Sequence, residues 1–194
     1  KFVKASKLDV RLEIPSLGIT NEYDVWTYPE QVDDEQDKVI IAKSATPELL
    51  KEIENGSIVL LVPDNTPDVE RMTFSNPFWS TILFDYQPKT MGLLCDPTHP
   101  IFKEFPTDGY TNWQWWELVS SASVARINKT PSSYRPILQV IDHPVRNDKL
   151  GAIMETRIGK GKLLICMLDI LSAPEKRIVA RQLKYSILHY MNSS

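Results

Sequence analysis

Five side chains with catalytic potential follow short apolar segments that we expect to be strands. They are Ser44, Asp64, Asp142, His143 and Asp169. In open α/β sheets a ligand binds beyond the carboxyl ends of the strands, so these residues would line one polar crevice. There His143 would act as a base, with Asp142 as the acid that orients it. Asp and Ser also gather at strand ends as turn formers and helix N-caps, and we favour that interpretation.

The cysteines and serines lack the surroundings that covalent catalysis requires. A nucleophile elbow needs small residues two positions either side of the nucleophile, because the strained turn tolerates nothing larger. Cys95 and Cys166 have leucine or proline at those positions, and no serine occurs in a Gly-x-Ser-x-Gly pattern. We therefore predict no catalytic residue in this chain.

Metal and cofactor binding are also not predicted. Neither His-x-x-x-His nor Cys-x-x-Cys occurs in the sequence, so no set of metal ligands is expected. The chain has only 7 glycines, which leaves little material for a loop that binds phosphate. Gly159-Lys160-Gly161 precedes an expected strand, whereas the glycines of a dinucleotide-binding fingerprint open a helix.

The most unusual stretch is rich in aromatic residues. Three of the five tryptophans, Trp113, Trp115 and Trp116, fall within four residues. Flat aromatic faces can stack on the apolar C–H faces of sugar rings, which makes Trp113 and Trp115 candidate ligand-binding residues. Large rings more often anchor a loop to the core, and we expect at least one of them to do so. The neighbours able to bind hydroxyl groups are Asp108, Asn112 and Gln114.

Composition excludes several classes of partner. Twenty-two basic and 25 acidic side chains leave a formal charge of -3, without the basic cluster of a nucleic-acid-binding protein. The longest strongly apolar runs, Ser57–Pro63 and Leu163–Ile170, are far shorter than the roughly 20 residues that cross a bilayer. Lys1–Pro15 lacks the apolar region of a signal peptide, although an excised or mature chain would look the same. We expect neither nucleic acid nor membrane as a partner.

The first 37 residues form a β segment of their own. Lys7–Ile14 alternates apolar and charged residues, which predicts a half-buried strand with one wet face. Tyr23–Pro29 is a second extended stretch, and an acidic loop follows at Glu30–Lys38. Such a pair of strands has no second sheet to bury against. We therefore expect residues 1–37 to belong with, or to bridge to, a neighbouring sandwich domain.

Residues 38–194 have the pattern of an α/β domain. Thr46 is an expected N-cap, with Pro47 at the first helical position and Gly56 at the helix end. Strands covered on both faces are expected at Val39–Ala42, Ile58–Val62 and Ile137–Ile141, of which the first two form a parallel βαβ unit. The remaining expected elements are helices near Asn76–Phe84 and Asn112–Ser121, a hairpin of Ala152–Ile158 with Lys162–Leu168, and a closing helix at Pro174–Met191.

Four segments of the chain resemble a known family. They are Asn21–Pro29, Leu49-Leu50 followed by Gly56–Pro63, His99–Thr107 with Trp113-Gln114-Trp115, and Gly159–Leu164. Together these segments resemble the C-terminal region of bacterial glycoside hydrolase family 2 proteins of the β-galactosidase type. That region is similar to a class I glutamine amidotransferase-like, or flavodoxin-like, domain. The resemblance implies an α/β fold with a three-layer open sheet and a short N-terminal β segment.

The resemblance also implies a function. It points to a non-catalytic accessory domain of a periplasmic or secreted enzyme of polysaccharide breakdown, which packs against neighbouring glycosidase domains of the same polypeptide. The catalytic glutamates of that family lie on a separate barrel, so none is carried over to this chain. The amidotransferase cysteine elbow and the downstream His-x-Glu are both missing here. The fold would then be kept without its chemistry.

Two alternatives remain open at this point. One is a carbohydrate-binding module whose partners are glycans, bound through Trp113, Trp115 and their neighbours. The other is a small hydrolase that uses Asp142, His143 or His99 in an unrecognised arrangement.

Overall fold

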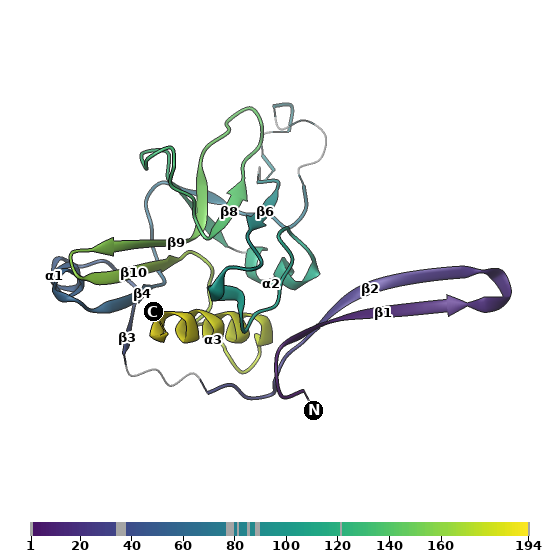
Figure 1. The fold of residues 1–194 in the computed structure, drawn as a ribbon. Helices are drawn as coiled ribbons and strands as arrows, with labels where there is room; N and C mark the ends of the chain where they lie inside the picture. The colour runs from purple at the N-terminus through teal and green to yellow at the C-terminus, as the bar shows by residue number, and fades with distance from the viewer. Residues whose placement is uncertain are drawn as a thin grey trace.

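The computed structural model describes residues 2–33, 38–76, 80, 82–84, 86–87, 90–120 and 122–193. Figure 1 shows a two-stranded arm that projects from a mixed α/β body. The arm consists of the antiparallel strands β1 (Ser6–Ile14) and β2 (Ile19–Thr27). A 3-10 turn at Pro15–Leu17 joins them, and Gly18 closes it in the left-handed conformation with φ of 63°. The first strand was predicted at Lys7–Ile14 and the second at Tyr23–Pro29, which covers only the latter part of β2. Neither face of β1 is buried over Leu8–Ile14, where the sequence predicted a half-buried strand.

Eight strands form the sheet of the body. In spatial order the main path is β3-β4-β10-β9-β7-β5, while β8 pairs with β9 and carries β6 on its other side. β3, β4 and β10 are mutually parallel, and the remaining pairs are antiparallel. The strand bounds are β3 Val39–Ala42, β4 Ile58–Leu61, β5 Val69–Arg71, β6 Gly92–Cys95, β7 Ser123–Arg126, β8 Leu138–Ile141, β9 Leu150–Ile158 and β10 Gly161–Cys166. The body is therefore a mixed α/β fold.

The parallel part of the sheet follows the predicted βαβ unit. Helix α1 (Pro47–Asn55) begins where Thr46 accepts a hydrogen bond from the amide of Leu49 at 3.2 Å, and it ends at Gly56. Two amide-to-carbonyl bonds run from Gly56 back to the last turn, and they satisfy carbonyls that the helix end leaves open. β4 then pairs in parallel with β3, as the sequence predicts.

Helices cover both faces of the sheet at β4. Alternate residues of a strand point to opposite faces, and here both sets are buried. Val59 and Leu61 pack with Ile53 of α1, whereas Leu60 belongs to the main core together with Leu183 of α3 (Ile178–Asn192). The arrangement is helix, sheet, helix at this end of the molecule. It explains why the predicted run Ile58–Val62 is apolar at every position.

Several predicted elements differ in the structure. β8 covers most of the predicted strand Ile137–Ile141, but both of its pairings are antiparallel. β3 is an edge strand, so Ile40 and Ile41 are exposed rather than covered on both faces. In place of one helix over Asn112–Ser121 the chain forms a 3-10 turn, Trp113–Trp115, and the single turn α2 (Trp116–Val119).

Two other predictions fall partly outside the described residues. A helix was expected at Asn76–Phe84. Residues 77–79 and 81 of it lie outside the described part of the chain, and residues 82–84 form a turn. Residues 34–37 of the expected acidic loop Glu30–Lys38 also lie outside the described part of the chain. The closing helix and the hairpin of β9 with β10 are confirmed.

Candidate functional site

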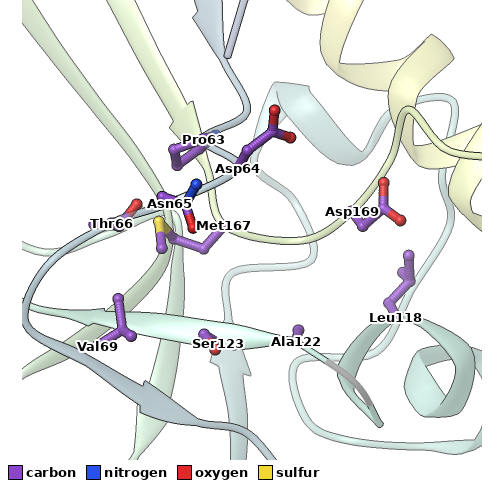
Figure 2. A pocket seen from close by; sticks show the side chains of 10 residues that line it. All are labelled: Pro63, Asp64, Asn65, Thr66, Val69, Leu118, Ala122, Ser123, Met167 and Asp169. Carbon is purple, nitrogen blue, oxygen red and sulfur yellow. The ribbon is translucent and has the colours of Figure 1, made fainter. Parts of the chain in front are cut away.

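A pocket lies where the sheet divides, beyond the carboxyl ends of β4 and β10. Ile153–Ile158 of β9 pair with β10. Nearer its start, at Leu150 and Gly151, β9 pairs on the same side with β7. The gap between β10 and β7 holds a cavity of about 310 Å³. Figure 2 shows the side chains around it, which come from the segments after β4 and β10 and from β5, β7 and α2: Pro63, Asp64, Asn65, Thr66, Val69, Leu118, Ala122, Ser123, Met167 and Asp169.

The structure thus brings together two of the five side chains predicted for a polar crevice. Asp64 and Asp169 line the pocket because β4 and β10 are parallel neighbours that end at the same edge of the sheet. Ser44, Asp142 and His143 are not among the residues that line it. Ser44 follows the edge strand β3, and Asp142 follows β8, which lies on the far side of β9.

Both carboxylates of the pocket are already engaged. Asp64 is exposed and forms an ion pair with Lys43 at 3.2 Å. Asp169 accepts hydrogen bonds from the amides of Leu171 and Ser172, and Arg177 donates to its other oxygen at 2.8 Å. Burial raises the pKa of Asp169, but these donors and the positive charge outweigh it and hold the pKa below its ordinary value.

The pocket offers polar groups that can hold a ligand. Besides the two carboxylates, they are an amide, Asn65, and two hydroxyls, Thr66 and Ser123. None of its described lining residues is a histidine, cysteine or lysine.

Asp142 holds a loop together. Its oxygens accept four hydrogen bonds, from the amides of His143 and Asp148 at 2.9 and 2.8 Å and from Nε and a terminal nitrogen of Arg146 at 2.8 and 2.6 Å. The bond to His143 involves its backbone amide, not the imidazole. Burial raises the pKa of Asp142, but the bonds from Arg146 and the two amides dominate and lower it.

The same loop belongs to an ion-pair network at the end of the sheet. Arg146 also pairs with Glu70 of β5 at 2.5 Å. Arg126 of β7 pairs with Glu70 and, at 3.0 Å, with Asp148. The network connects the loop after β8 to β5 and β7. Asp142 therefore has a structural role: it holds Arg146 within this network.

The aromatic segment divides between core and surface. Trp115 is fully buried, its rings pack edge-on against Phe102 and Phe105, and its Nε1 donates to the hydroxyl of Thr107 at 3.0 Å. Its faces are therefore closed to any ligand, which removes Trp115 from the predicted sugar platform. Trp113 is 75% exposed and stays available, with its ring 5.3 Å from that of Phe74.

The remaining candidates for chemistry are not activated. Burial raises the pKa of Cys95 to about 11 and that of Cys166 to about 12, which keeps both thiols protonated at neutral pH. Burial lowers the pKa of His99, whose Nδ1 accepts the amide of Ile101 at 3.2 Å. No group of three or more His, Cys, Asp or Glu side chains suited to a metal ion occurs among the described residues.

The arm carries a large apolar face that nothing in the described structure covers. The register pairs Leu8 with Val25, Val10 with Tyr23 and Ile14 with Ile19, so apolar side chains of both strands share one face. The opposite face is charged, with Arg11 bonded to Glu13 at 2.5 Å and close to Glu22. The exposed apolar side chains of the first face, called here the apolar face of the arm, are Leu8, Val10, Leu12, Ile14, Ile19, Tyr23 and Val25.

The root of the arm is fixed to the body. Lys7 pairs with Asp108 at 3.0 Å, and its ammonium lies 5.6 Å from the ring centre of Trp26. Just after β2, Tyr28 stacks on Phe105 and accepts a hydrogen bond from Gln114 at 2.8 Å. Arg181 of α3 donates to the carbonyl of Pro29 at 3.0 Å. The direction in which the arm leaves the body is set by these contacts.

Sequence reasoning located the arm and indicated that its strands have no second sheet to pack against, and the structure shows the apolar face exposed. No helix in the described part of the chain is long and apolar enough to span a membrane.

A family described as "Domain of unknown function (DUF8487)" matches residues 40–194, a region that begins after the arm. No curated protein matches the chain.

Proposed function

The chain belongs to this family of domains of unknown function, and we propose that it is a non-catalytic accessory domain that packs against a neighbouring domain of the same polypeptide through the apolar face of its arm. The observation that carries the proposal is that face itself. Leu12 at its centre is 60% exposed, and Ile14 and Ile19 at the far end are about half exposed. Contiguous exposed apolar patches of this kind mark interaction sites.

The arm needs a partner on physical grounds. An isolated two-stranded hairpin is only marginally stable in water, and a third strand or packing against another layer is what stabilises it. The root contacts at Lys7 and Tyr28 hold one end of the arm, but the residues from Asp9 to Asp24 have no cover from the described body. A second apolar layer on the arm would supply what the hairpin lacks.

The size of the face favours a linked domain over a free partner. Strands of nine residues are about 30 Å long, which gives a two-stranded ribbon a face of about 300 Å². A stable complex of separate molecules buries about 800 Å² on each partner. A covalently linked domain is present at an effective concentration of millimolar order, so a smaller contact is sufficient. The occupant that fits is an apolar sheet face in the same polypeptide.

The family resemblance in the sequence supports the identity of that neighbour. We propose a glycoside hydrolase of family 2 type as the parent, with a periplasmic or secreted location, and a flavodoxin-like origin for the body. The pocket at β4 and β10 has engaged carboxylates and no histidine, cysteine or lysine among its described lining residues, which supports a body that kept its fold without catalysis.

Matched substitutions on the two faces of the arm test the proposal. Leu12→Asp places a charge on the apolar face, and Thr20→Lys places one on the opposite, solvated face, where it lies opposite Glu13. In the full natural polypeptide we expect Leu12→Asp to lower the unfolding temperature and Thr20→Lys not to lower it. In the isolated chain both should be nearly neutral, because both positions are exposed there.

Three results would overturn the proposal. One is a natural polypeptide without any further domain, and another is an unfolding temperature that Leu12→Asp leaves unchanged in the full polypeptide. The third is hydrolysis of aryl glycosides or aryl esters by the isolated chain at rates typical of enzymes, which would contradict the non-catalytic assignment.

A further inference from the structure

A second surface, independent of the arm, has the features of a ligand site. β6 pairs with β8 on one side, and on the other side Leu94 forms a bridge with Tyr110. A cleft of about 300 Å³ lies over this part of the sheet, between Phe74, Met91, Tyr110 and Ile141. Its volume is at the lower end of the range of roughly 300–1,000 Å³ that is usual for small-molecule sites.

Trp113 lies next to the cleft, and contacts with neighbouring residues fix the turn that carries it. Its ring rests against Phe74, which lines the cleft, at 5.3 Å between ring centres and an angle of 35°. The turn that carries it is capped by Asn112, whose side chain accepts the amide of Gln114 at 3.1 Å and donates to Asp108 at 2.8 Å. Two residues further on, Trp115 anchors the same turn in the core.

Packing in the core does not account for the aromatic side chains at positions 113 and 110, because both are largely exposed. Trp113 and Tyr110 are 75% and 57% exposed, so they contribute little buried area to the fold. A bridge to Leu94 nevertheless holds Tyr110 in the lining of the cleft, and Trp113 packs on Phe74 of the same lining. Aromatic side chains with one open face and a polar tip are typical of ligand contacts.

The lining determines the class of ligand. No described residue that lines the cleft is charged, so neither an anion nor a cation is favoured there. The polar groups are the Asn76 amide, the Tyr110 hydroxyl and the Thr111 hydroxyl, which accepts the amide of Leu93 at 2.6 Å and keeps its proton for a ligand. The rest of the lining is apolar or aromatic. A neutral ligand with an apolar flat face and hydroxyl groups around it suits this lining.

We propose that this cleft binds the pyranose rings of neutral glycans. Tyr110 would stack on the C–H face, Asn76 and Thr111 would bond to hydroxyls, and Trp113, packed on Phe74, would extend the aromatic surface at the rim. A purely apolar ligand would need a deeper, closed pocket, whereas this cleft is open and carries polar groups. The platform differs from the one predicted from the sequence, because Trp115 is replaced by Tyr110 and Phe74 from other segments of the chain.

Calorimetric titration of the chain with defined oligosaccharides tests the inference. The probes are cellohexaose, xylohexaose and β-1,4-galactotetraose as neutral glycans, with oligogalacturonate as the charged comparison. We expect saturable binding of at least one neutral glycan and none of oligogalacturonate. Trp113→Ala should weaken binding by at least about tenfold, as expected for loss of a stacked aromatic face.

Trp116→Ala is the matched control. Trp116 is 54% exposed and lies in the same segment, but its ring does not pack on Phe74 of the cleft as that of Trp113 does, so binding should be unchanged. The absence of saturable binding of every neutral glycan up to about 10 mM would overturn the inference. Equal loss in both variants, or preference for oligogalacturonate, would overturn it as well. These outcomes do not involve the arm, so they are separate from the test of the accessory function.

Discussion

Asp142→Asn tests the assignment of Asp142 as a structural residue. The substitution keeps the size of the side chain, removes its charge and replaces one acceptor oxygen with a donor. The native carboxylate is 1% exposed and accepts four hydrogen bonds, two of them from Arg146. Asparagine can keep about two of these bonds and leaves the other two donors facing an amide NH₂ group.

The expected cost is about 3–6 kcal/mol, since two bonds are lost and each bond to a charged group contributes about 1.5–3 kcal/mol. For a chain of this length that corresponds to a fall of about 6–24 °C in the unfolding temperature. Urea unfolding at pH 7 measures the free energy directly. Asp64→Asn is the control, because Asp64 and Lys43 are both 60% exposed and such pairs contribute at most about 1 kcal/mol.

The pH dependence has a definite sign. The pKa of Asp142 is lowered in the folded chain, so its contribution is fully present above the unfolded value of about 3.9. It is lost as the pH falls through the folded pKa, because both states then bind the proton. The difference between the native chain and Asp142→Asn should therefore shrink in acid. A variant within about 0.5 kcal/mol of the native chain at pH 7 would refute the structural role.

Three further substitutions or reagents probe other parts of the account. Trp115→Ala should lower the free energy of unfolding in urea by about 3–5 kcal/mol, because this ring is buried. Trp113→Ala should lower it by less than about 0.5 kcal/mol, because that ring is exposed, and equal losses in the two variants would contradict this difference in burial. Cys95 and Cys166, with pKa values raised to about 11 and about 12, should react slowly with iodoacetamide at pH 8 until the chain unfolds. Rapid labelling of the folded chain would contradict the raised pKa values. Gly161→Ala should lower the free energy of unfolding by at least about 2 kcal/mol, because the new Cβ would lie 2.1 Å from a carbonyl oxygen of α1. An unchanged free energy in the same assay would contradict this close approach.

Local features of the fold were predictable where neighbouring residues determine them. Thr46, Pro47 and Gly56 carry the start and end signals of α1, and the structure has the helix between them. The turn between β9 and β10 follows from Gly159, whose φ of 57° is in the left-handed region. In each case the interaction spans only a few residues, so the sequence contains the whole cause.

Strand direction was not predictable from the same information. The apolar segment at Leu138–Ile141 fits a parallel or an antiparallel strand equally well, because its burial pattern does not depend on its neighbours' direction. Its pairing with β6 and β9 is a long-range choice. As a result Asp142 and His143 follow a strand on the far side of β9, away from the pocket at Asp64 and Asp169.

The candidate site residues show the same limit. The sequence indicated that one tryptophan of the cluster would be core, but the choice of Trp115 depends on contacts with Phe102 and Phe105. The sugar-binding cleft was not foreseen, since Phe74 and Ile141 come to it from segments far apart in the chain. The apolar face of the arm was visible as an alternating pattern with no second sheet to cover it, while the exposure of each side chain required the structure.

Hydrogen exchange of the arm tests the central claim most directly. Amide exchange of β1 and β2 should be measured in the isolated chain and in the full natural polypeptide under the same conditions. Because a bare two-stranded hairpin is marginally stable, its amides should exchange quickly in the isolated chain and at least about tenfold more slowly when a neighbouring domain covers the apolar face. Equal rates in the two samples would contradict the account, since the arm would then have no partner in its own polypeptide.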